Sequence, residues 1–184
     1  MALALVAAGC GDDSGAARTD ANESSASTER SDPAADGVFV PYALLEAPGW
    51  TLREAIDLPP DHILTGIEPV PSEWYAEYQR LEPAADGWGH AVKLAGFAVG
   101  LDAYRSSMEE LGVSFEPVDT AAGEGLAGTT AEQGARPVIV VVPLSQGTLE
   151  LLSYELSSEE LVALVGDIDV VDDAGWRAAG GQVT

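Results

Sequence analysis

Residues 136–144 read RPVIVVVPL, and residues 148–155 read TLELLSYE. The first run is apolar at every position from Val138 to Val142, which is typical of a strand that is covered on both faces. The Ser-Gln-Gly at positions 145–147 favours a tight turn between the two runs. The sequence therefore predicts a β-hairpin in the centre of a sheet.

A helix is predicted on each side of this hairpin along the chain. The later helix begins at a capping box, in which the Ser157 and Glu160 side chains would satisfy backbone N–H groups of the first turn. The earlier helix runs from Leu101 to Leu111, where we expect Asp102 to cap the start and Gly112 to provide the left-handed residue at the end.

The remaining strands are short and are separated by turn residues. We expect residues 50–56 to return from residues 38–46 as a hairpin, and residues 73–80 to pair with residues 90–99. Residues 113–118 are also predicted to be extended. Strands and helices do not alternate strictly, so the sequence predicts an α+β fold, mainly an antiparallel sheet with two helices packed on one face.

The first 37 residues differ from the rest of the chain. Gly11 to Gly37 contains no Val, Ile, Leu, Met, Phe, Tyr or Trp, so it cannot bury enough apolar surface to offset the entropy of ordering. We predict a signal-peptide remnant at 1–9, a disordered acidic, Ser- and Ala-rich tether at 10–37, and one α+β domain at 38–184. The 46% of hydrophobic residues suffices for the core of that domain.

The chain is strongly acidic. Its net charge is −23, it has eight basic residues, and Lys93 is its only lysine. Nucleic acids and anionic lipids recruit Lys and Arg, so nucleic acid is excluded as a partner. We interpret the charge as a solvated surface, with attraction to divalent cations or to a basic partner as the alternative, and we expect a monomer.

The N-terminus carries a recognisable pattern. Residues 5–10 read LVAAGC, and the polar Gly-Asp-Asp follows at once. This run resembles the lipobox of bacterial lipoproteins, in which a signal peptidase cleaves before a cysteine that carries a diacylglyceryl group. Ala7 replaces the usual Leu and the basic start is missing, so we interpret the segment as a truncated signal peptide. The resemblance implies lipid attachment at Cys10, on the extracytoplasmic face of the cell membrane.

A second, fainter resemblance covers Leu151 to Trp176. This run is similar to the closing strand and helix of uncharacterised extracytoplasmic domains of high-GC bacteria. Similar modules occur in membrane-tethered regulatory proteins associated with anti-sigma factors. The resemblance supports the fold class.

The one cofactor-binding motif in the sequence lacks the context that its chemistry needs. Gly123, Gly125 and Gly128 spell G-x-G-x-x-G, but that motif needs a strand before it and a helix after it. Here another strand is expected to follow, and Glu124 would repel phosphate. We therefore interpret these residues as turn glycines and expect no cofactor.

The remaining titratable residues match no catalytic or metal-binding pattern. His62 and His90 are expected on the surface. Asp167, Asp169, Asp172 and Asp173 do not match an EF-hand loop, which needs Gly at its sixth position and Glu at its twelfth. We expect no catalytic residue and no metal site, and we predict that the protein is not an enzyme.

Aromatic residues provide the last candidate site. Aromatic side chains in strands usually belong to the core, but if exposed together they would form a binding surface for a glycan, a peptide or a protein. The residues are Trp50, Trp74, Tyr75, Tyr78 and Trp88.

We expect a lipid-anchored lipoprotein with a non-catalytic interaction or sensory domain, whose partner is an unknown envelope protein, glycan or apolar ligand. A carrier of a lipid or other apolar ligand is the alternative, and it needs a sheet curved around a cavity of several hundred, roughly 300–1,000, Å³. A hydrolase is the least supported class.

Overall fold

The computed structural model describes residues 40–58, 72–80, 90–130 and 137–182. Every described residue belongs to one compact unit, Asp36–Thr184. The predicted signal remnant and tether lie outside the described residues. Within the described ranges, no helix is long and apolar enough to cross a membrane.

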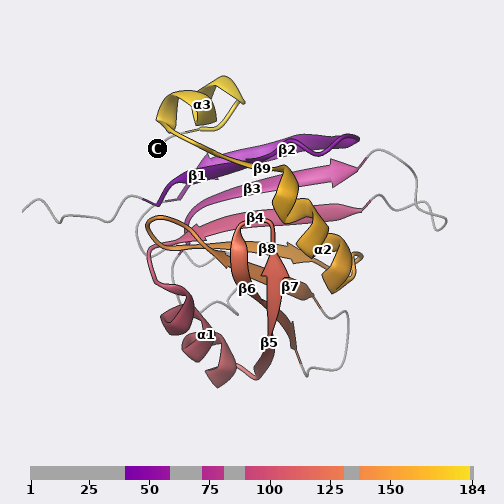
Figure 1. The fold of residues 1–184 in the computed structure, drawn as a ribbon. Coiled ribbons are helices and arrows are strands. Elements are labelled where there is room, and N and C mark those ends of the chain that lie inside the picture. Colours follow the sequence, from indigo (N-terminus) through magenta and orange to yellow (C-terminus); the bar gives the residue numbers. More distant parts are fainter. Residues whose placement is uncertain (1–39, 59–71, 81–89, 131–136, 183–184) are drawn as a thin grey trace, which may run out of the picture. The chain divides into compact units, whose positions relative to one another are not determined.

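The described residues form a seven-stranded sheet, a two-stranded sheet and three α-helices (Figure 1). The larger sheet contains β2 (Trp50–Asp57), β3 (Ser72–Arg80), β4 (Ala91–Phe97), β5 (Val113–Thr120), β6 (Gly123–Thr130), β7 (Val138–Pro143) and β8 (Thr148–Ser153). The smaller sheet contains β1 (Tyr42–Leu45) and β9 (Ile168–Val171). The helices are α1 (Leu101–Glu110), α2 (Ser158–Leu164) and α3 (Asp173–Ala178), and the 3₁₀ turn η1 (Val165–Asp167) follows α2.

The larger sheet has the strand order β2-β3-β4-β8-β7-β6-β5, and every neighbouring pair is antiparallel. The predicted α+β class, with a mainly antiparallel sheet, is therefore confirmed. β6 and β9 are strands that the sequence analysis did not predict.

β7 and β8 form the predicted hairpin inside the sheet. Val138 pairs with Ser153 at its open end, and positions 139–142 are at most 2% exposed. Gly147 closes the turn with φ +98°, and a Cβ there would lie 2.2 Å from the carbonyl oxygen of Phe97. The turn therefore requires glycine on two grounds, its left-handed backbone and its close packing.

β1 does not form the predicted hairpin with β2. Tyr42 of β1 pairs with Val171 of β9, and β2 pairs with β3 instead. All four residues of β1 are buried, so the strand is stabilised by cover on both sides, which the edge of the larger sheet would not provide. The predicted pairing of residues 73–80 with residues 90–99 is confirmed as β3 with β4.

The helices pack on opposite faces of the larger sheet, whereas the sequence predicted one helical face. Met108 of α1 shares a core cluster with Ile139 and Val141. Leu161 of α2 belongs to another cluster, with Val140. Successive strand residues point to opposite faces, and β7 is apolar throughout, so both faces need cover. We call these faces the α1 face and the α2 face.

The two helix starts differ in how well they were predicted. The capping box of α2 is confirmed, because the Ser157 hydroxyl accepts from the Glu160 N–H and the Glu160 carboxylate accepts from the Ser157 N–H at 2.8 Å. The N-cap of α1 is Gly100, not Asp102. Asp102 lies in the first turn instead, where its carboxylate accepts from Arg105 at 3.2 Å.

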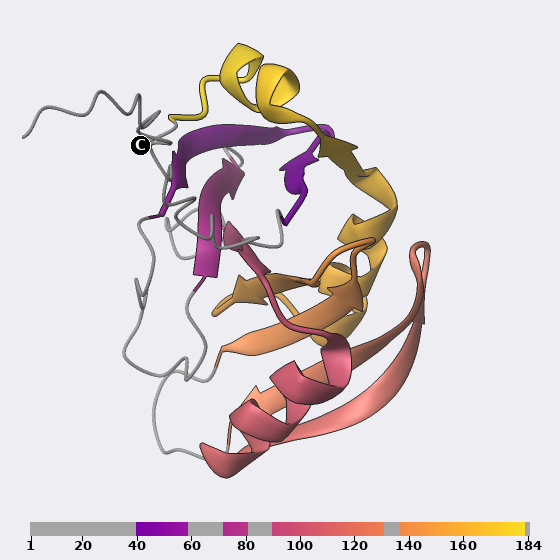
Figure 2. The same ribbon diagram turned by 90° about the vertical axis from the view of Figure 1, so that its left-hand side faces the viewer.

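An aromatic cluster joins the end of the chain to its first strand on the α2 face. Tyr42 of β1 stacks on Trp176 of α3 with ring centroids 4.6 Å apart, and Trp74 of β3 lies 5.6 Å from Trp176. All three side chains are at most 3% exposed. α3 contacts β1 and covers this end of the sheet (Figure 2).

Candidate functional site

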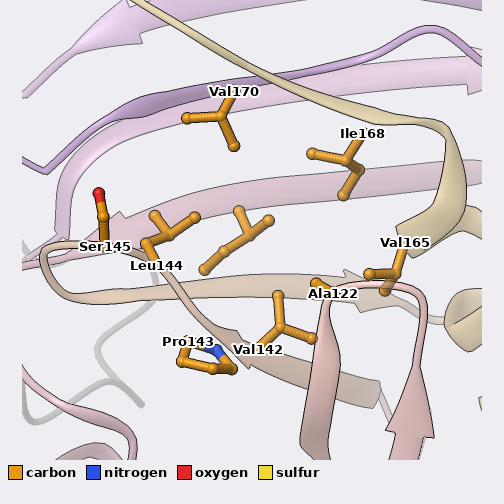
Figure 3. A pocket seen from close by; sticks show the side chains of 9 residues that line it. Ala122, Val142, Pro143, Leu144, Ser145, Val165, Ile168 and Val170 are labelled. Atoms are coloured by element: carbon orange, nitrogen blue, oxygen red, sulfur yellow. The ribbon is translucent and has the colours of Figure 1, made fainter.

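A pocket of about 230 Å³ lies on the α2 face, between β9 and the tip of the β7–β8 hairpin (Figure 3). The hairpin, η1, β9 and the turn between β5 and β6 all contribute to it. It is lined by Ala122, Val142, Pro143, Leu144, Ser145, Leu149, Val165, Ile168 and Val170.

The pocket is apolar from its base to its rim. Of the described residues that line it, Ser145 alone has a polar side chain. Val142 and Leu149 at the base are each 1% exposed, whereas Val170 at the rim is 52% exposed. Binding of a group in this pocket would therefore be stabilised mainly by the burial of apolar surface.

The hydrogen-bonding pattern between β1 and β9 determines which backbone groups of β9 face away from β1, beside the pocket. The Glu46 N–H donates to the Asp167 carbonyl at 2.9 Å, which identifies these residues as a hydrogen-bonded pair of the β1–β9 ladder. Bonded and non-bonded pairs alternate in antiparallel ladders. The backbone N–H and C=O groups of Ile168 and Val170 therefore point away from β1.

β9 consequently has a free edge among the described strands, where β1 is its single partner. The Ile168 N–H is used within the chain, because it donates to the Val165 carbonyl of η1. The N–H and C=O of Val170 and the C=O of Ile168 remain at the open edge. These are the two β9 residues whose side chains line the pocket.

The surroundings of the pocket are acidic. Asp167 and Asp169 flank Ile168 in the sequence, and both are exposed. Glu124, next to the β5–β6 turn, is exposed as well. With a net charge of −23 for the whole chain, the potential at this rim favours cationic groups.

The predicted aromatic surface is not present among the described residues. Trp74, Tyr75 and Tyr78 are 1%, 7% and 3% exposed, as the core alternative expected. Trp50 is partly buried and packs against the core, and Trp88 lies outside the described residues.

The other residues singled out from the sequence do not converge on one site. Cys10 and His62 lie outside the described residues, and His90 is partly buried just before β4. Asp172 caps α3 by accepting from the Gly175 N–H, and Asp173 pairs with Arg177 at 2.9 Å. The described residues contain no group of three or more His, Cys, Asp or Glu side chains placed to hold a metal ion.

The glycines of the G-x-G-x-x-G motif lie within strand β6, not at a turn before a helix. A Cβ on Gly128 would meet the Phe115 ring at 2.5 Å, and one on Gly125 would meet the Val141 carbonyl at 2.6 Å. The motif therefore serves close packing within the sheet. The prediction that these are turn glycines holds for Gly123 alone, which follows the β5–β6 turn.

A buried carboxyl group on the α1 face was missed by the sequence analysis. Glu150 of β8 is 2% exposed and accepts a hydrogen bond from the Tyr104 hydroxyl of α1. Burial raises the pKa of Glu150 from 4.5 to about 7, and the hydrogen bond from Tyr104 partly opposes this shift. Its position between Leu149 and Leu151 in a strand with apolar residues on both faces was the available signal.

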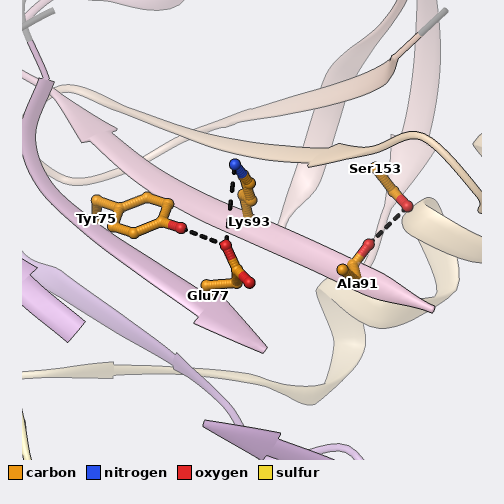
Figure 4. A network of polar contacts seen from close by, with 5 residues as sticks. All are labelled: Tyr75, Glu77, Ala91, Lys93 and Ser153. Atoms are coloured by element: carbon orange, nitrogen blue, oxygen red, sulfur yellow. Dashed lines mark hydrogen bonds and ion pairs between the residues drawn. The ribbon is translucent and has the colours of Figure 1, made fainter. Parts of the chain in front are cut away.

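Two smaller sets of polar contacts connect residues of the larger sheet (Figure 4). The Tyr75 hydroxyl donates to Glu77 at 2.6 Å, and Lys93 lies 3.8 Å from the same carboxylate. Burial, followed by the hydrogen bond to Glu77, raises the pKa of Tyr75. The Ser153 hydroxyl donates to the Ala91 carbonyl at 2.7 Å on the α2 face, where alternation along β8 places it with Leu149 and Leu151. The Lys93–Glu77 and Ser153–Ala91 contacts join neighbouring strands, whereas the Tyr75–Glu77 hydrogen bond lies within β3. None of these residues lines the pocket.

A comparison of the chain with models of protein families, with the curated proteins and with the solved structures finds no match.

Proposed function

We propose that the protein is a lipoprotein, held by lipidated Cys10 on the extracytoplasmic face of the cell membrane, whose folded domain is a non-catalytic binding module. The observation that carries the second part is the apolar pocket beside the free edge of β9. The lipobox resemblance at residues 5–10 supports the first part.

The lining of the pocket favours binding over catalysis. Its side chains supply apolar contact and one hydroxyl, which suits the burial of an apolar group. General acid–base chemistry requires a titratable group within hydrogen-bond reach of the substrate. The buried Glu150 belongs to the α1 face, on the other side of the sheet from the pocket.

A carrier of an apolar ligand is the second candidate, because the same lining would suit an acyl chain. The volume of the pocket argues for a single apolar side chain as the occupant rather than a complete small molecule. Small-molecule sites usually measure about 300–1,000 Å³, and the pocket measures about 230 Å³. The α2 face beside it is filled by the aromatic cluster of Tyr42, Trp74 and Trp176.

Mass spectrometry of membranes from cells that carry the full-length gene tests the anchor. We expect the mature protein to begin at Cys10 with a diacylglyceryl group, and we expect a Cys10→Ala variant to leave the membrane fraction. An unmodified Cys10, or an unaltered distribution of the variant, would overturn the anchor.

A photo-crosslinking amino acid at position 170 tests the binding module. The same group at Ala163, which is exposed on α2, provides the matched control. We expect crosslinked partners at position 170 that are absent at position 163. Equal labelling from the two positions would contradict a specific binding surface at the pocket.

A further inference from the structure

We infer that an extended segment of a partner polypeptide adds to the free edge of β9 as a third strand and places an apolar side chain in the pocket. This inference rests on the proposed binding function and specifies the partner. Three features of the described residues carry it: the state of the sheet edges, the position of the pocket and the surrounding charge.

The edges of the larger sheet are protected, whereas the edge of β9 is not. β5 has Pro117 in its middle, a residue without an N–H, and exposed Glu116 beside it. β2 is covered at its outer edge by Gln182, which bonds to Ala55 and Asp57 through its backbone. Proteins usually protect edges in these ways against the addition of further strands.

β9 instead presents the N–H and C=O of Val170 to the outside, next to a side chain that is 52% exposed. No proline occurs in β9. Its one acidic residue, Asp169, forms a hydrogen-bonded pair with Leu44 of β1. The backbone N–H and C=O groups of Asp169 therefore point towards β1 and not to the open edge.

The pocket lies where an added strand would need it. A residue placed directly opposite Val170 would point its side chain to the same face as Val170. That face carries the pocket, because Ile168 and Val170 both line it. Backbone hydrogen bonds would supply part of the affinity and the pocket would select an apolar residue, which is how strand addition achieves specificity. The volume of about 230 Å³ fits side chains better than a complete small ligand.

The charge argues for a basic partner and against a second copy of this chain. Asp167 and Asp169 are exposed on β9 and its approach, so Lys or Arg residues that flank the added strand would be attracted. Two copies with a net charge of −23 each would repel one another as their β9 edges came together.

The probe is a synthetic nine-residue peptide in which three valines alternate with two threonines and two lysines stand at each end. Its binding to the full chain is measured by fluorescence anisotropy with a dye at one terminus. We expect saturable binding that weakens at high salt. A peptide N-methylated at alternate residues, which cannot form one row of strand hydrogen bonds, should bind at least about tenfold more weakly.

Val170→Pro is the matched change in the protein. It removes the N–H at the open edge without removing a bond to β1, so we expect at least about tenfold weaker peptide binding. Val170→Thr keeps the N–H and a branched side chain, and it should retain binding within about threefold. Circular dichroism and thermal unfolding establish that both variants fold, and the N-methylated peptide gives the same test without any change in the protein.

Ser145→Phe tests the pocket separately from the strand edge, because the larger side chain would fill the pocket from its exposed rim. It therefore distinguishes binding in the pocket from strand addition at β9. If Ser145→Phe abolishes binding while Val170→Pro and the N-methylated peptide bind normally, the pocket binds ligands but strand addition is wrong. If the wild-type chain does not bind the peptide, the inference fails, and crosslinking at position 170 decides separately whether the binding module survives. Concentration-dependent dimers in light scattering would assign the edge to a second copy and would also overturn the inference.

Discussion

Glu150 is the residue whose chemistry depends most on its surroundings. It lies in β8 between Ala95 of β4 and Val141 of β7, and Tyr104 of α1 donates to it from above the sheet. A carboxylate in such a site loses its hydration, so the protonated form is favoured and its pKa rises to about 7. The folded state therefore holds a proton that the unfolded chain releases near the ordinary pKa of 4.5.

The direction of the pH effect follows from this difference. Below about pH 4.5 both states are protonated and Glu150 carries no ionisation penalty. As the pH rises from there to about 7, the unfolded state ionises first, so stability is lost, and above about pH 7 the loss is constant. The loss is on the order of 3 kcal/mol.

Glu150→Gln should remove this loss, because a glutamine carbonyl can still accept from Tyr104 and never ionises. We expect urea unfolding at pH 8 to show a more stable variant, with a difference that shrinks towards zero at pH 4. Glu155→Gln, at an exposed position after β8, is the control. A constant difference between wild type and Glu150→Gln over this pH range would contradict the assignment.

At the scale of elements, short helices and strands depend on how their ends are held. α2 has seven residues, a length at which a helix is marginal by itself. Its capping box satisfies two backbone N–H groups that the first turn cannot satisfy internally. Leu161 is its fully buried residue on the sheet, and η1 leads from its end into β9 and the pocket.

Ser157→Ala should reduce the free energy of unfolding by about 1 kcal/mol, because it removes the capping oxygen. Chemical denaturation followed by circular dichroism measures the change. Ser158→Ala, the same substitution one residue later and inside the helix, should change stability by less than about 0.5 kcal/mol. Equal effects of the two substitutions would show that the capping box contributes little.

At the scale of the whole domain, the aromatic cluster closes the fold. Trp176 is 0% exposed and brings the C-terminal helix onto β1 and β3. Its buried indole Nε1 has no hydrogen-bond partner among the described residues, where packing holds the side chain in place. The contact joins residues more than a hundred positions apart, and its loss would loosen β1, β9 and α3 together.

Trp176→Ala should lower the free energy of unfolding by about 3–5 kcal/mol. That is a large part of the roughly 5–15 kcal/mol by which a typical domain is stable. Trp176→Phe should cost less, because the ring remains and the unsatisfied N–H disappears. Leu111→Ala, at a residue that is 46% exposed, serves as the control. Thermal unfolding followed by circular dichroism ranks the variants by stability. A Phe variant as unstable as the Ala variant would contradict the role of ring packing.

Local patterns predicted the elements whose determinants are neighbours in the sequence. The apolar run of β7, the turn at Gly147 and the Ser157–Glu160 capping box each act within a few residues, so the central hairpin and α2 follow from the sequence alone. The α+β class follows from the order of the elements. The Cys10 anchor stays a prediction from the sequence.

Only the tertiary structure decided the features that join distant segments. The pairing of β1 with β9 brings Tyr42 beside Val171, and no local pattern specifies such a partner because the hydrogen-bonding groups of every strand are alike. Val165, Ile168 and Leu144 read as ordinary core residues, yet together with the rim they form the pocket. The sequence by itself thus determined the class of fold, its central hairpin and its capped helix. The free edge of β9 and the pocket beside it exist because long-range packing places β9 beside β1 and, among the described strands, beside no other.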